Sequence, residues 1–63
     1  MWEISTVTSD GTILWLSWDK LWYWALFEPE KQLFLSRKEA LEVKHFICDA
    51  AHRPMEIKYV DDR

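Results

Sequence analysis

The segment Leu21–Phe27 reads LWYWALF and contains no charged residue, no glycine and no proline. A strand with one wet face alternates apolar and polar residues, because successive side chains point to opposite faces. This segment does not alternate, so as a strand it needs apolar cover on both faces. Its aromatic content and the following Pro29 favour a strand. An alternative helix would begin at Ser17 and place four apolar residues at helical spacing. Those residues are Trp18, Leu21, Trp22 and Ala25.

The shortness of the chain makes this cover a problem. A core built from fewer than about 70–80 residues rarely supplies more than about 3–5 kcal/mol without a disulfide, a metal or a partner chain. Cys48 is the single cysteine among 63 residues, so no internal disulfide forms. Ten aromatic residues, five of them tryptophan, remain as the main source of stability. We expect one small domain over residues 1–63.

Turn signals divide the first half of the chain into strands. Asp10-Gly11 is a strong two-residue hairpin signal, Asp19-Lys20 is a weaker one, and Pro29 suits a turn. The sequence therefore predicts strands over residues 2–8, 13–18, 21–27 and 32–35. Together they would form a four-stranded antiparallel β-meander.

The second half begins with a helix signal. Ser36 followed by Glu39 three residues later is the pattern of a capping box, and apolar residues then recur at helical spacing up to Pro54. This predicts a helix over residues 37–51. Residues 55–60 alternate apolar and polar, which predicts a C-terminal strand. The expected fold class is α+β, with the helix packed on one sheet face.

Two-residue turns fix which residues share a face. They set Thr6 opposite Trp15, Trp15 opposite Trp24, and Leu16 opposite Tyr23. One face then carries Trp2, Ile4, Thr6, Ile13, Trp15, Trp22, Trp24, Leu26, Leu33 and Leu35. The other carries Glu3, Ser5, Val7, Leu14, Leu16, Trp18, Leu21, Tyr23, Ala25, Phe27 and Phe34. A slip of one residue in either turn would invert part of this assignment.

One helix covers one face of a small sheet, and the small residues Ala40 and Ala50 on its inner side suit the face rich in tryptophan. The second face would then expose more apolar area than monomers usually do. We therefore expect a protein partner there, either a second copy of the chain or a host protein. The predicted partner-binding residues are Leu14, Leu16, Trp18, Tyr23, Phe27 and Phe34.

A metal site is the strongest chemical candidate in the sequence. His45, Cys48 and His52 share one side of the predicted helix, and zinc accepts these ligand types. A single segment supplies all of them, and a buried cysteine with a histidine at a helix end explains the same pattern. We expect no metal, no cofactor and no catalytic residue, because no nucleophile has an evident base and orienting group.

Charge argues against nucleic acid as the partner. The net charge is −3, and Arg37-Lys38 is the largest basic cluster, whereas a phosphate backbone needs several cations on one face. No apolar run is long enough for a membrane span, and the lone thiol agrees with a cytoplasmic protein. We expect a non-catalytic interaction protein, with its size suggesting a phage or mobile-element inhibitor or modulator of a host protein. The alternatives are a small nucleic-acid-binding protein using exposed aromatics, and a structural subunit or assembly factor of a larger complex.

Overall fold

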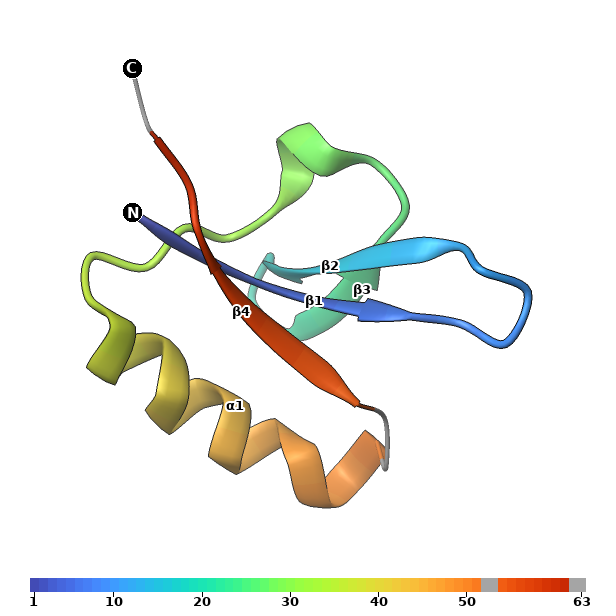
Figure 1. Ribbon diagram of the computed structural model, residues 1–63. Coiled ribbons are helices and arrows are strands. Elements are labelled where there is room, and N and C mark those ends of the chain that lie inside the picture. The colour runs from blue at the N-terminus through green and yellow to red at the C-terminus, as the bar shows by residue number, and fades with distance from the viewer. Residues whose placement is uncertain (52–53, 62–63) are drawn as a thin grey trace.

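The computed structural model describes residues 1–51 and 54–61. The strands are β1 (Trp2–Val7), β2 (Ile13–Trp18), β3 (Trp22–Ala25) and β4 (Met55–Tyr59), with the 3-10 helix η1 (Glu28–Glu30) and the helix α1 (Arg37–Ala51) between β3 and β4. They form a four-stranded antiparallel sheet in the order β3-β2-β1-β4, with α1 lying alongside it (Figure 1). The predicted α+β class, the helix and the C-terminal strand are confirmed. The alternative helix through residues 18–27 is not formed.

The predicted fourth meander strand is wrong. Residues 32–35 form a single bridge between Phe34 and Trp2, and β4 is the fourth strand of the sheet instead. The backbone N–H of Gln32 donates to the Leu16 carbonyl at 2.9 Å, and Phe34 exchanges two 2.8 Å backbone hydrogen bonds with Trp2. The segment thus bonds to β2 through Gln32 and to β1 through Phe34. Both bonds lie past Ser5 and Trp15, the last pair that β1 and β2 make with each other. Divided between two strands, it cannot pair continuously with either.

The first hairpin has a three-residue loop. The Thr8 amide donates to the Thr12 carbonyl at 2.8 Å, and the Gly11 amide donates to the Thr8 carbonyl at 3.0 Å. Gly11 has a φ of 89°, as expected for the left-handed residue that follows a type I turn in such loops. The extra loop residue sets Thr6 opposite Leu14, so the predicted pairing of Thr6 with Trp15 is wrong.

The second hairpin contains the same kind of error. Trp18 pairs with Trp22, so three residues form the loop, and Lys20 at its centre has a φ of 65°. Leu16 therefore lies opposite Trp24, whereas a two-residue turn would have set it opposite Tyr23. Lysine rarely takes a positive φ, so no residue in this loop indicates its length.

The two errors cancel across the sheet, so only β2 has its faces exchanged. The face that we call the core face carries Trp2, Ile4, Thr6, Leu14, Leu16, Trp18, Trp22, Trp24, Met55, Ile57 and Tyr59. The opposite face carries Glu3, Ser5, Val7, Ile13, Trp15, Ser17, Tyr23, Ala25, Glu56 and Lys58. Ser17, Glu56 and Lys58 join Glu3 and Ser5 on this face, while Leu14, Leu16 and Trp18 lie on the core face instead. The opposite face is therefore much less apolar than predicted.

The core collects side chains from every part of the sheet and from α1. Its buried members are Ile4, Leu16, Phe34, Ala40 and Met55, and Trp2, Trp22, Trp24, Val43, Ile47 and Ile57 pack against them. Each fully buried large apolar side chain contributes about 1.5–3 kcal/mol. Both main-chain groups of Met1 bond to Val60, which fixes the two ends of the described chain side by side (Figure 1). No helix among the described residues is both long and apolar enough to cross a membrane.

Candidate functional site: an aromatic groove beside the helix

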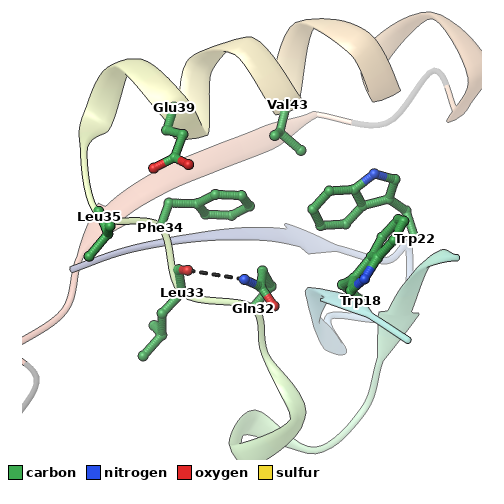
Figure 2. A pocket seen from close by; sticks show the side chains of 8 residues that line it. All are labelled: Trp18, Trp22, Gln32, Leu33, Phe34, Leu35, Glu39 and Val43. Atoms are coloured by element: carbon green, nitrogen blue, oxygen red, sulfur yellow. Dashed lines mark hydrogen bonds between the residues drawn. The ribbon is translucent and has the colours of Figure 1, made fainter. Parts of the chain in front are cut away.

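A groove of about 530 Å³ opens between the end of the second hairpin, the segment before α1 and the first turns of α1 (Figure 2). We call it the aromatic groove. It is lined by Trp18, Trp22, Gln32, Leu33, Phe34, Leu35, Glu39 and Val43. Six of these eight side chains are apolar, so the groove offers mainly hydrophobic and aromatic contacts.

Three aromatic rings in contact line the groove from its floor to its rim. The ring centroids of Trp18 and Trp22 lie 4.8 Å apart with an interplanar angle of 60°. Trp22 and Phe34 stack at 6.1 Å and 25°. Both spacings fall in the range that aromatic pairs prefer. The three-residue loop is what brings the first pair together, since it sets Trp18 directly opposite Trp22 on the core face.

The groove has a buried floor and an exposed rim. Phe34 is 5% exposed and belongs to the core, while Trp18 and Leu35 are 51% and 79% exposed. The bridge to Trp2 holds the backbone of Phe34 and so aims its ring inward. Leu35, the next residue, consequently points the other way and reaches the rim (Figure 2).

Glu39 supplies the groove's carboxylate. The Ser36 hydroxyl accepts a hydrogen bond from the Glu39 amide at 3.1 Å, which is one half of the predicted capping box. Among residues 1–51 and 54–61 the Glu39 carboxylate has no hydrogen-bond or salt-bridge partner, so the other half is not formed. The carboxylate faces the groove instead (Figure 2). Among the residues that the structure describes, no lysine or arginine lines the groove.

A second hollow, of about 450 Å³, lies on the opposite face and contains an ionic cluster. Lys31 Nζ lies 2.9 Å from Glu3 Oε1 and 3.4 Å from Glu28 Oε2, and the Trp15 indole donates to Glu3 Oε2 at 3.1 Å. Burial acts to lower the pKa of Lys31, but the hydrogen bond and the charge of Glu3 outweigh it and raise that pKa above 10.5. Each charge in this cluster has a partner, so the cluster anchors the residues after η1 to β1.

The six predicted partner-binding residues do not lie on one surface. Trp18 and Phe34 line the groove, the latter as its floor. Leu16 is 1% exposed in the core and has no surface to offer a partner. The other three lie apart: Leu14 is half-buried on the core face, Tyr23 is exposed on the opposite face, and Phe27 is exposed at the N-cap of η1. Binding by any of them stays a prediction.

Sequence reasoning missed six groove residues as site residues: Trp22, Gln32, Leu33, Leu35, Glu39 and Val43. The predicted register separated Trp22 from Trp18, and the predicted strand over residues 32–35 made Leu35 a face residue. One signal was present in the sequence. Glu39 and Val43 are four residues apart, a spacing that places both on one side of a helix.

The metal candidate is only partly described. His45 lies exposed on α1. The Cys48 side chain and all of His52 lie outside the described residues, so the expectation of no metal stays a prediction. Within the part that the structure describes, no three His, Cys, Asp or Glu residues gather in metal-binding geometry.

Comparison with protein-family models finds no match, and comparisons with curated proteins and with solved structures find none either.

Proposed function

We propose that this chain is a non-catalytic protein-interaction domain that binds an apolar side chain of a partner protein in the aromatic groove. In this proposal α1 packs on the core face and forms the second wall of the groove. The observation that carries it is the pairing of a rigid aromatic floor with an exposed rim. Trp22 and Phe34 stack below, and Trp18 and Leu35 stand half or more exposed above.

The energetics of such a surface favour binding. Exposed tryptophan is the residue type most enriched at interface hot spots, and packing against Trp22 already fixes the Trp18 ring. A fixed ring loses little conformational entropy when a partner covers it. Leu35 adds an apolar contact on the other rim, so an inserted side chain would be covered from two sides.

The open shape of the groove favours a protein over a small molecule. Small-molecule sites bury about 70–90% of their ligand, whereas here the apolar surface continues beyond the walls. Phe46 is 76% exposed and lies three residues beyond Val43 along the same side of α1. An extended partner segment reaches both the groove and Phe46, and a compact ligand does not.

The chemistry of the lining favours binding over catalysis. Glu39 and Gln32 are its polar side chains, and the side-chain amide of Gln32 already donates to the Leu33 carbonyl at 3.2 Å. General acid–base and nucleophilic catalysis need cooperating groups, and within the described part of the lining the exposed Glu39 carboxylate has no neighbouring acid, base or nucleophile. The cytoplasmic location and the inhibitory role expected above remain proposals based on cysteine usage and chain length.

A peptide selection tests the proposal and requires no candidate partner. Random peptides displayed on phage are selected against the folded chain, and the affinities of synthetic winners are measured by calorimetry. We expect peptides with a large apolar anchor. Trp18→Ala and Leu35→Ser should weaken them by about thirtyfold, the value of one hot spot.

Val7→Ser is the matched control, because Val7 is an exposed apolar residue on the opposite face. It should leave peptide affinity unchanged. Peptides that bind Trp18→Ala as tightly as the unaltered chain, or a selection that returns no specific peptide, would contradict the assignment of the groove.

A further inference from the structure

The outer edge of β3 is open. β3 lies at one end of the sheet, and within residues 1–51 and 54–61 its backbone bonds only to β2. An exposed edge presents unpaired N–H and C=O groups to any strand that approaches it. Proteins usually protect such an edge with charged residues or proline, and Trp22–Ala25 contains neither.

The other edge of the sheet is protected. β4 carries Glu56 and Lys58, which pair with each other at 3.3 Å and are both well exposed. Charges that alternate along a strand discourage pairing with a second sheet. The difference between the two edges therefore singles out β3 as the edge suited to pairing.

β3 is only four residues long, so its backbone alone supports a short ladder. The residues that flank it add the missing apolar area. Leu21 precedes β3 and is 74% exposed, and Leu26 and Phe27 follow it at 62% and 68%. These residues flank β3 directly in sequence, Leu21 in the hairpin loop and Phe27 at the N-cap of η1.

The sequence around β3 is complementary to itself when one copy is reversed. About Trp24 as centre, Tyr23 mirrors Ala25, Trp22 mirrors Leu26, and Leu21 mirrors Phe27. A two-fold antiparallel pairing centred on Trp24 thus sets apolar residues against apolar residues.

We propose that two copies of this chain pair β3 with β3 in antiparallel orientation, centred on Trp24, to form a continuous eight-stranded sheet. This rests on the proposed function in that protein association is the role of the chain, and it names a second copy as one partner. The interface is isologous, as in most closed dimers. It also covers the outer edge of Leu21–Phe27, the segment whose lack of polar residues the folded monomer leaves unexplained.

The first test is molar mass by sedimentation equilibrium between 1 and 200 μM, in 150 mM salt. We expect a dimer for the unaltered chain. Tyr23→Lys places a charge on the β3 edge and Tyr59→Lys places the same charge on β4, so the second is the matched control. The β3 variant should lose at least about thirtyfold in dimer affinity, the effect of one hot spot, and the β4 variant should not.

Phe27→Glu repeats the test outside the β3 strand, since Phe27 is exposed and lies at the N-cap of η1. It should dissociate the dimer while the circular dichroism spectrum stays unchanged. A monomer at every concentration overturns the proposal, and so does a dimer that only Tyr59→Lys dissociates.

Peptide binding in the groove and dimerisation through β3 can be measured independently. Trp18→Ala should leave the dimer mass unchanged and weaken peptide binding about thirtyfold. Phe27→Glu should dissociate the dimer and leave peptide binding unchanged. A groove that binds peptides in a strictly monomeric chain overturns the dimer and leaves the proposed function standing.

Discussion

Phe34 and Trp2 hold each other through two backbone hydrogen bonds of 2.8 Å, one in each direction. This bridge joins the segment before α1 to the first strand, and it lies behind the floor of the aromatic groove. Fold and candidate site therefore depend on the same residue. The Phe34 ring fills the core on one side and stacks on Trp22 in the groove.

Phe34→Ala should unfold most of the protein. Removing a buried phenylalanine costs about 3–5 kcal/mol, which matches the whole stability expected of so small a domain. Circular dichroism during urea unfolding measures the loss. Phe46→Ala is the control, because Phe46 is exposed on α1 and its removal should change stability by no more than about 0.5 kcal/mol. Equal stability of the two variants would show that Phe34 is not a core residue.

Glu3→Gln should destabilise the fold by about 1.5 kcal/mol, because the Lys31 ammonium loses its closest carboxylate and keeps only the more distant Glu28. Adding Lys31→Met removes the ammonium that this change leaves poorly paired, so the double variant should regain most of the loss. Urea unfolding at pH 7 gives both values. A double variant less stable than Glu3→Gln alone would mean that the two side chains do not act as a pair.

The same pair predicts a dependence on alkaline pH. The folded state raises the pKa of Lys31 above 10.5, so its stabilising effect is complete below pH 10.5 and is lost as pH rises through the folded value. Thermal unfolding midpoints should therefore fall more steeply above pH 10.5 in the unaltered chain than in the double variant. Parallel curves would contradict this.

Asp10 should titrate at unusually low pH. The Thr8 hydroxyl and then the Thr12 side chain and amide donate to its carboxylate, and they lower its pKa from 3.8 to about 2. The folded pKa is depressed, so the contribution of the Asp10 carboxylate to the stability of the fold is present above pH 3.8 and is lost as pH falls toward 2. Carboxyl carbon shifts measured by NMR report the titration, and a midpoint near 3.8 would contradict the hydrogen bonds in the loop. Asp10→Asn should remove this titration while those of the other carboxyl groups remain.

The helix, the C-terminal strand and the strand content of the first half could be predicted from the sequence, because each has a local signal. Ser36 caps α1, Pro54 follows it, and residues 55–59 alternate. Register could not be predicted from the same signals. The pair Asp10-Gly11 suits a two-residue turn as well as a three-residue loop with Gly11 as its left-handed residue, and Lys20 gives no sign of its positive φ.

The candidate site was the feature hardest to predict because of this ambiguity in register. One residue of slip exchanges the faces of β2, which moves Leu16 into the core and sets Trp18 beside Trp22. Local patterns also gave no means to predict that residues 32–34 bond to β1 and β2 at once, since that arrangement depends on contacts far apart in the chain. Apolar content was enough to predict a binding surface, and not enough to place it.

Nucleic acid should not bind at physiological salt. The chain carries a net charge of −3, and Glu39 is the charged residue of the groove lining. Affinity for a phosphate backbone comes from several cations that displace counterions. Fluorescence anisotropy with labelled single-stranded DNA and RNA checks this, with a polylysine-tagged copy of the chain as the positive control. Micromolar binding that weakens with salt would favour the nucleic-acid alternative.

The central claim is that the aromatic groove, and not the opposite face, receives the partner. The indole N–H resonances of the tryptophans report this directly in a 15N-labelled sample titrated with a selected peptide. The resonances of Trp18 and Trp22 should shift with saturation, while that of Trp15, bonded to Glu3 on the opposite face, should stay in place. A titration that shifts Trp15 and leaves Trp18 and Trp22 unchanged would place the binding surface on the other side of the sheet and contradict the account.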